Sequence, residues 1–120
     1  MQYTRHKGLR RLLAAFGNSL AGFRFAFRRD EAVRQEFVAI ALLAPVALLS
    51  GKSTVEIVLL ISGLFAVLIT ELLNTAIECA IDRISMDYHD ISKASKDIAS
   101  AAVLLSLLYC AVVWIAIFLF

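Results

Sequence analysis

Residues 57–83 read IVLLISGLFAVLITELLNTAIECAIDR, an apolar run that becomes acidic in its second half. An α-helix rises about 1.5 Å per residue, so the part from Ile57 to Ile81 is longer than the roughly 30 Å hydrocarbon core of a bilayer. Ser62 is the only polar side chain between Ile57 and Ile69. The stretch therefore predicts a membrane-spanning helix.

Two other uncharged blocks extend this prediction. Residues 98–120 are long enough to cross a membrane, whereas residues 37–50 alone would form only about 21 Å of helix. Pro45 is tolerable in a membrane helix, and residues 32–33 can extend the shorter block backward. We expect an all-α integral membrane protein with a surface helix at about 8–28 and spans at about 33–50, 55–82 and 97–120.

The distribution of basic residues predicts the orientation of these spans. Eight of the twelve Lys and Arg residues precede Phe37, one lies in the hairpin at Lys52, and three lie between Arg83 and Lys96. Three spans put both basic regions on the cytoplasmic side, as the positive-inside tendency requires, whereas two spans would separate them. The N-terminus is then cytoplasmic and the C-terminus external.

Composition supports one membrane-embedded domain over residues 1–120. Hydrophobic side chains make up 61% of the chain, against about 45–50% in typical soluble domains. Cys79 and Cys110 lie in apolar segments without metal-ligand spacing, so we expect neither a disulfide nor a zinc site. We also expect no cleavable signal peptide and no nucleic-acid partner.

The segment from Gly8 to Phe27 has the periodicity of an amphipathic helix. Its apolar residues recur at spacings of three and four, with Arg10, Arg11 and Arg24 between them. A basic helix of this kind suits the surface of an anionic membrane. The alternative is a helix that packs on the protein's own body.

Four polar residues of the second predicted span share one face. Glu71, Asn74, Glu78 and Asp82 follow one another so that the three carboxylates fall within about 40° around a helix. A carboxylate that faces lipid costs at least about 2.5 kcal/mol, so this stripe must face protein, water or a cation. It could serve a reaction at the membrane surface or a polar contact between helices.

The following loop and the start of the last span contain groups that suit phosphate. Lys96 and Asp97 are predicted to open a helix, whose free N–H groups and positive dipole end attract anions. In the structural alternative, Asp90 or Ser92 caps the helix and Lys96 reaches to the interface. His89 has no partner at a spacing typical of a metal site.

Four blocks resemble the prokaryotic diacylglycerol kinase family: GFR at 22–24, RQE at 34–36, ELLNTAIECAIDR at 71–83 and KDIASAAV at 96–103. The resemblance implies a homotrimer of three-span subunits in the bacterial inner membrane, with active sites shared between neighbours. It also implies transfer of the γ-phosphate of Mg-ATP to diacylglycerol, which gives phosphatidic acid.

The same resemblance implies roles for individual residues. Glu71 would be the general base, with Asn74 orienting the site, and Glu78 would bind the metal. Contacts to the nucleotide side would come from Arg11, Asn18, Asp30, Glu78, Asp82, His89, Lys96 and Asp97.

The sequence departs from the family pattern at two positions. Asp30 and Glu31 stand where the family usually has one glutamate metal ligand, and either could take that role. Asn18 stands where a tyrosine is often found near the nucleotide, so a stacking or hydroxyl contact would be lost.

Two other functions compete with this reading. Undecaprenol is phosphorylated by relatives of this fold, and the stripe alone does not separate the two acceptors. A small transporter or proton-channel subunit could use Glu71, Glu78 and Asp82 as a relay. However, the stripe covers only half of its span, so no continuous relay is visible.

Overall fold

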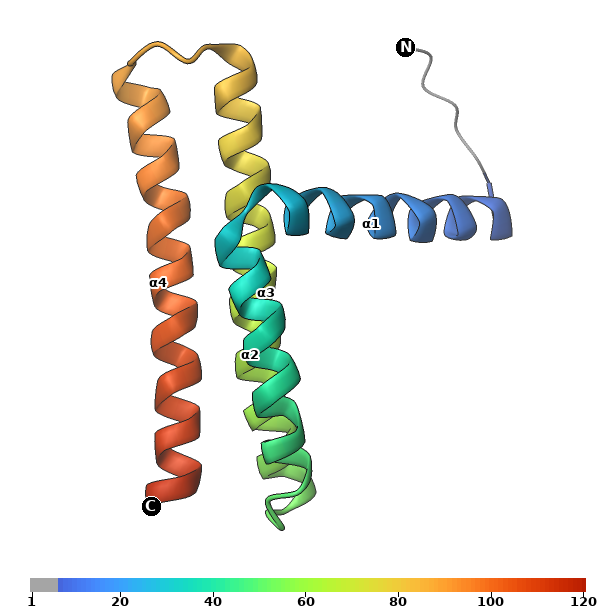
Figure 1. The fold of residues 1–120 in the computed structure, drawn as a ribbon, viewed down its shortest axis with the longest axis vertical. Coiled ribbons are helices and arrows are strands. Elements are labelled where there is room, and N and C mark those ends of the chain that lie inside the picture. The colour runs from blue at the N-terminus through green and yellow to red at the C-terminus, as the bar shows by residue number, and fades with distance from the viewer. Residues whose placement is uncertain (1–6) are drawn as a thin grey trace.

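The computed structural model describes residues 7–120 as four α-helices. They are α1 (Leu9–Arg29), α2 (Glu31–Leu48), α3 (Thr54–Ile84) and α4 (Asp90–Leu119). Helices α2, α3 and α4 run along the long direction of the molecule, and α1 projects sideways from them (Figure 1). Among the described residues the chain is therefore all-helical, as predicted.

A single residue joins α1 to α2. Asp30 gives its backbone N–H to the carbonyl of Ala26 at the end of α1, and its side chain accepts a hydrogen bond from the N–H of Ala32 at 2.9 Å. Arg34 donates to the carbonyls of Phe27 and Arg28 at 2.9 and 3.1 Å. These contacts satisfy helix-end groups on both sides of the turn, which fixes the direction in which α1 leaves the bundle.

The start of α3 is specified by a capping box. The Ser53 side chain accepts from the N–H of Glu56, and the Glu56 carboxylate accepts from the N–H of Ser53. This reciprocal pair satisfies two free donors at the helix start. Gly51 precedes it with a φ of 74°, a left-handed conformation that favours glycine at this turn.

Close packing and small polar contacts join α3 to α4. A Cβ atom added at Gly63 would lie only 3.1 Å from the Cys110 backbone, so the two helices approach closely there. The hydroxyls of Thr70 and Ser106 share a hydrogen bond of 2.7 Å. Further along, Trp114 Nε1 donates to the carbonyl of Leu60 at 3.1 Å.

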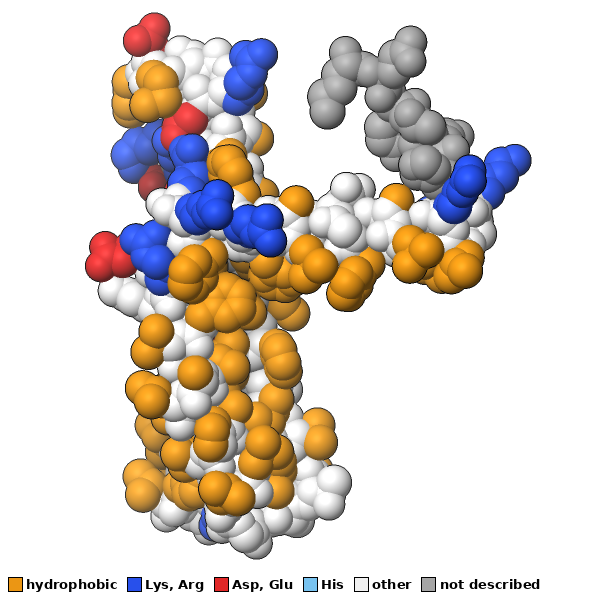
Figure 2. Space-filling view, turned by 45° about the vertical axis from the view of Figure 1, so that its right-hand side comes forward, with side chains coloured by type: hydrophobic (Ala, Val, Ile, Leu, Met, Phe, Trp, Pro, Cys, Tyr) orange, Lys and Arg blue, Asp and Glu red, His pale blue; other side chains and the backbone are white. Residues whose placement is uncertain are grey.

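One cluster of buried apolar residues lies where α1, α2 and α3 meet. Ala26, Val33 and Leu68 form its centre, and three partly buried residues pack against it: Phe37, Ile40 and Leu72. Most other large apolar side chains are exposed. Apolar side chains cover the bundle below α1 (Figure 2), and a surface this apolar is typical of a protein that contacts a membrane or another apolar partner.

Two described helices, α3 and α4, are long and apolar enough to cross a membrane. Helix α2 is outside this group because its 18 residues include three charges, on Glu31, Arg34 and Glu36. The helix that contains the last predicted span starts at Asp90, well before residue 97. The difference arises because His89 caps α4 and the intervening polar residues form its first turns.

Candidate functional site

The junction between α1 and α2 brings one predicted site residue against α3. Asp30 Oδ2 accepts a hydrogen bond from the hydroxyl of Thr75 at 2.5 Å. Thr75 is buried, and its hydroxyl also contacts the Glu71 carbonyl at 3.0 Å. The carboxylate of Asp30 is therefore held beside the polar face of α3. Glu31, by contrast, is exposed, and within residues 7–120 its one side-chain hydrogen bond is with Gln35, at 3.5 Å.

Four carboxylates gather around this point, and we call them the acidic cluster: Asp30, Glu36, Glu71 and Glu78. Glu71 is near enough to the other three for charge repulsion to act between them. Among residues 7–120, no Lys or Arg forms an ion pair with any of the four. The cluster therefore concentrates negative charge in a partly buried place.

Asn74 completes this part of the polar face. Its amide N–H donates to Glu78 Oε1 at 3.1 Å, which fixes the orientation of both side chains. Its carbonyl oxygen, Oδ1, is buried and accepts no hydrogen bond within the described part of the chain. A buried acceptor without a donor is unfavourable, so this oxygen is available to a donor from a ligand or another molecule.

Asp82, one turn beyond Glu78, has a different environment. Lys96 Nζ on α4 lies 2.7 Å from one carboxylate oxygen, and the Arg29 guanidinium lies 3.6 Å from the other. All three side chains are partly exposed to solvent. Asp82 therefore links the end of α1, α3 and the start of α4, and it holds Lys96 close to the polar face of α3.

The start of α4 corrects two expectations drawn from the sequence. His89, rather than Asp90 or Ser92, caps the helix, because its Nδ1 accepts from the N–H of Ile91 at 3.1 Å. Lys96 and Asp97 lie beyond the first turn, so the free N–H groups of the helix start are not at these residues. Exposed Asp97 forms an ion pair with Lys93 at 2.6 Å.

A polar pocket nevertheless opens beside these groups. Its lining joins the end of α3, the connecting loop and the start of α4, and includes Asp82, His89, Lys93, Lys96 and Asp97. Cationic Lys93 and Lys96 stand next to acidic residues in it, so the pocket offers both signs of charge. It is separate along α3 from the acidic cluster by about one to three helical turns.

Two predicted site residues are not brought to this region. Arg11 and Asn18 lie on the part of α1 that projects away from the bundle (Figure 1). Arg11 is about 27 Å along the helix from Arg29, at 1.5 Å per residue. Within residues 7–120, neither side chain has a hydrogen bond or ion pair with the polar face of α3.

The described residues contain no group of three His, Cys, Asp or Glu side chains arranged to hold a metal ion. The chemistry of the acidic cluster nevertheless fits a magnesium ion that carries phosphate oxygens as further ligands. Mg²⁺ prefers oxygen ligands and commonly takes only one or two carboxylates from the protein. The unpaired negative charge of the cluster is the feature that fits it.

Sequence reasoning missed three residues of this region. Thr75 lies four residues after Glu71 and thus on the same helix face, a spacing that could have identified it. Glu36 is in the RQE block but was not given a role. Arg29 contacts Asp82 only because the chain turns at Asp30, and no sequence spacing indicates that contact.

Comparison with known proteins gives a consistent result. Residues 17–118 match the family model described as "Prokaryotic diacylglycerol kinase". The chain is 46% identical over 112 residues to a diacylglycerol kinase of Pseudomonas aeruginosa. The aligned residues make up 93% of this chain and 91% of that protein. This chain is 40% identical over 107 residues to that of Escherichia coli K12, with 89% and 88% covered. A Helicobacter pylori diacylglycerol kinase is 33% identical over 108 residues, with 90% and 84% covered.

Proposed function

This chain belongs to the prokaryotic diacylglycerol kinase family and is a lipid kinase, and from that premise we propose that it phosphorylates diacylglycerol to phosphatidic acid with Mg-ATP. The relatives named diacylglycerol kinase match over most of their length. The observation that carries the proposal is the acidic cluster beside Asn74, because phosphoryl transfer depends mainly on positioning and neutralisation of charge.

In the proposed reaction, Glu71 accepts the proton of the primary hydroxyl of diacylglycerol. The hydroxyl oxygen forms a bond to the γ-phosphorus, the bond from that phosphorus to the bridging oxygen breaks, and ADP leaves with the electron pair. Asn74 orients Glu78 through its 3.1 Å hydrogen bond and keeps its own Oδ1 free for a donor. No covalent enzyme intermediate is needed.

Glu78 and Asp30 are the residues that we propose hold the metal. Both belong to the acidic cluster, whereas Glu31 is exposed and forms a hydrogen bond with Gln35. When bound, Mg²⁺ would neutralise charge on the ATP phosphates. Asp30 already uses one oxygen to cap α2 and the other to accept from Thr75, so those contacts preset the direction of its carboxylate.

Lys96 is the cation that we propose meets the phosphates. The ion pair between Lys96 and Asp82 keeps the lysine ammonium group at the proposed cytoplasmic end of α3, where a water-soluble nucleotide can bind. Asp82 also contacts Arg29, so it holds two cations at this end. Asp97 and His89 would contribute from the walls of the polar pocket.

We also propose three membrane spans and a homotrimer in the bacterial inner membrane, with a cytoplasmic N-terminus and an external C-terminus. The exposed apolar surface of the bundle and the charge distribution support this placement. Helix α1 would then lie at the membrane surface. The length of α1 supports shared sites, because Arg11 and Asn18 can reach a nucleotide only at a neighbouring subunit if they stay on this extended helix.

The test is transfer of labelled γ-phosphate from Mg-ATP by the purified protein in mixed micelles, with diacylglycerol and undecaprenol offered separately. We expect labelling of diacylglycerol, and loss of at least about a hundredfold in rate for Glu71→Gln, as for removal of a general base. Glu56→Gln is the matched control, because glutamine preserves the capping box and Glu56 is far from the cluster.

Each outcome has a separate meaning. Preference for undecaprenol would change the acceptor but keep the site. Full activity of Glu71→Gln would remove Glu71 from the role of base. Labelling of neither lipid by a folded protein would overturn the kinase proposal and favour the transporter alternative.

A further inference from the structure

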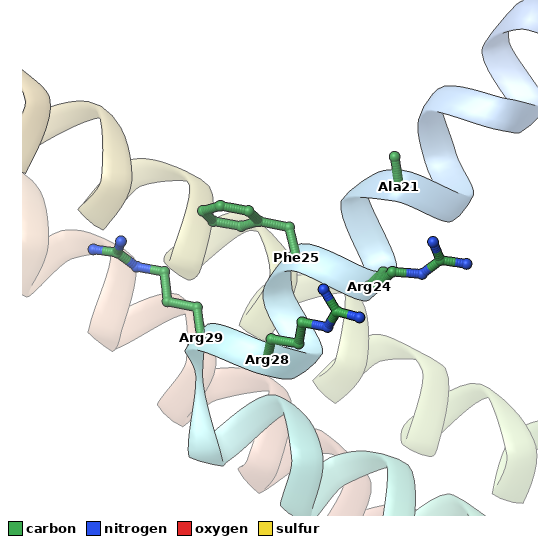
Figure 3. A pocket seen from close by; sticks show the side chains of 5 residues that line it. All are labelled: Ala21, Arg24, Phe25, Arg28 and Arg29. Atoms are coloured by element: carbon green, nitrogen blue, oxygen red, sulfur yellow. The ribbon is translucent and has the colours of Figure 1, made fainter.

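Two side-chain contacts of unequal strength join the bend between α1 and α2 to α3. Arg29 extends from the last turn of α1 in the direction opposite to the two other arginines drawn in Figure 3, and its guanidinium lies 3.6 Å from the carboxylate of Asp82. Both side chains of this pair are partly exposed, and an exposed ion pair holds two elements together only weakly. The second contact, between Asp30 and Thr75, involves a buried hydroxyl.

The hydroxyl of Thr75 faces two acceptors but has only one proton to donate. Asp30 Oδ2 lies 2.5 Å from the hydroxyl oxygen, and the carbonyl oxygen of Glu71 lies 3.0 Å from it. Within α3, the Glu71 carbonyl also accepts from the backbone N–H four residues further along the helix. Because the carboxylate of Asp30 is nearer and charged, it takes the hydroxyl proton.

The side chain of Thr75 is restrained, so its donor points in a fixed direction. Thr75 is only 3% exposed, and β-branching limits rotation about χ1 in a helix. Valine has nearly the same shape, but it would place a methyl group against the carboxylate oxygen and remove this donor. Serine would keep the donor and lose only the methyl group that restricts χ1.

This contact also fixes where Asp30 lies relative to Glu71. Asp30 belongs to the bend, whereas Glu71 lies one turn before Thr75 on α3. The two carboxylates are close enough to repel each other, and this repulsion favours movement of the bend away from α3. A hydroxyl that is bonded to Asp30 and touches the backbone of Glu71 opposes that movement.

We propose that Thr75 is a positioning residue, which holds Asp30 at the place from which its carboxylate binds Mg²⁺. Each carboxylate oxygen has more than one acceptor site, so the hydrogen bonds from Thr75 and Ala32 leave acceptor sites for a metal. The inference rests on the proposed function, in which Asp30 is a metal ligand. It adds a residue that acts without touching the metal or the substrates.

The first measurement is a Mg²⁺ titration of labelled phosphate transfer to diacylglycerol. We expect Thr75→Val to raise the Mg²⁺ concentration for half-maximal rate by about tenfold, an effect typical of residues that orient metal ligands, with little change in the rate at saturating Mg²⁺. Thr75→Ser should keep most of the affinity, because serine retains the donor. A shift in Thr75→Ser as large as in Thr75→Val would overturn the proposal, since the donor would then have no effect.

Thr70→Val is the matched control, because it removes a hydroxyl of the same type from the same helix. Thr70 Oγ1 shares a hydrogen bond with Ser106 of α4 at 2.7 Å and donates to the Ala66 carbonyl at 3.1 Å, without contact to the bend. We expect this variant to lower the free energy of unfolding without shifting the Mg²⁺ titration. Equal shifts in Thr70→Val and Thr75→Val would indicate general loosening of α3 and would contradict the proposal.

Binding of Mn²⁺ gives a readout that does not require turnover. Mn²⁺ also suits carboxylate ligands, and electron paramagnetic resonance measures the share bound to the protein in the presence of a non-hydrolysable ATP analogue. Thr75→Val should weaken this binding by the factor by which it shifts the Mg²⁺ titration, and unchanged Mn²⁺ binding would overturn the proposal. Absence of phosphate transfer by the unsubstituted protein would count against the proposed reaction, while the Mn²⁺ comparison would still test Thr75.

Combination with Asp30→Asn tests whether Thr75 acts through Asp30. If it does, Thr75→Val has little further effect on the Mg²⁺ and Mn²⁺ titrations once Asp30 is replaced. Shifts that multiply would mean that Thr75 acts independently of Asp30, and no shift in Asp30→Asn alone would remove Asp30 as a ligand; either result overturns the proposal. Circular dichroism checks that each variant is folded, and Thr75→Ala, which removes the same hydroxyl, replaces Thr75→Val if valine prevents folding.

Discussion

At the scale of single residues, the same type of side chain has different roles according to its partners. Glu78 is paired with an amide, Asp82 with two cations, and Asp30 with a hydroxyl and a backbone N–H. The stripe on α3 was predictable because helical geometry fixes which residues share a face. Its partners were not, since Asp30 and Arg29 reach α3 only through the turn between α1 and α2.

The choice between Asp30 and Glu31 as metal ligand can be tested at this scale. We expect Asp30→Asn to raise the Mg²⁺ concentration for half-maximal activity by about tenfold or more, the effect typical of altered metal-site residues, and Glu31→Gln to leave it nearly unchanged. The measurement is a Mg²⁺ titration of phosphoryl transfer, with Glu78→Gln as the reference for a lost ligand. A larger effect at Glu31 than at Asp30 would reverse the assignment.

Asp30→Asn also changes a helix cap, so stability must be measured beside it. Asparagine is about as good an N-cap residue as aspartate, and we therefore expect little loss of folding free energy. A change in the metal titration with unchanged unfolding would then reflect the lost carboxylate rather than a displaced α2.

At the scale of elements, α1 and α3 were predictable from their patterns, and the start of α4 was not. Spacings of three and four indicated α1, and a long apolar run indicated α3. Histidine is not among the favoured N-cap residues, so the sequence does not indicate a helix start at Asp90. The polar residues from Asp90 to Ser95 were therefore expected to belong to the loop. His89 Nδ1 supplies the missing cap, and α4 begins there.

The contact between α3 and α4 gives a prediction at this scale. Gly63→Leu should lower the free energy of unfolding by about 1–3 kcal/mol, because a larger side chain forces apart helices that meet at the Cys110 backbone. Denaturant titration in mixed micelles, followed by circular dichroism, measures it. Gly17→Leu is the control, since a Cβ there meets nothing within 4 Å in the subunit.

A stability of Gly63→Leu equal to that of the unsubstituted protein would mean that the two helices separate easily at this point. Comparable losses at Gly63 and Gly17 would instead show that leucine disturbs either position, without a specific helix contact.

At the scale of the whole molecule, the sideways course of α1 separates residues that the family resemblance assigned to one site. Arg11 and Asn18 are on the projecting helix, and the acidic cluster is at the bundle (Figure 1). The sequence alone could not show this separation, because it depends on the angle at which two helices leave one residue. The proposed homotrimer with shared sites would bring them together.

Mixed trimers test that assembly. We expect Arg11→Gln and Glu71→Gln each to be nearly inactive alone, and mixing with subunit exchange to restore part of the activity. Restoration follows if one site takes Arg11 from one subunit and Glu71 from another, because some mixed sites then contain neither substitution. Labelled phosphate transfer before and after exchange is the readout, and no recovery after confirmed exchange would contradict shared sites.

Because Asp30 is the only residue between α1 and α2, the bend between the two helices has little conformational freedom. Both helices use this residue as a terminus, and Arg34 ties the last carbonyls of α1 to α2. One residue inserted at the end of α1 would rotate the rest of α1 by about 100° about its axis. The polar and apolar faces of this amphipathic helix would then point in new directions. Length is therefore constrained at this bend more strictly than residue type.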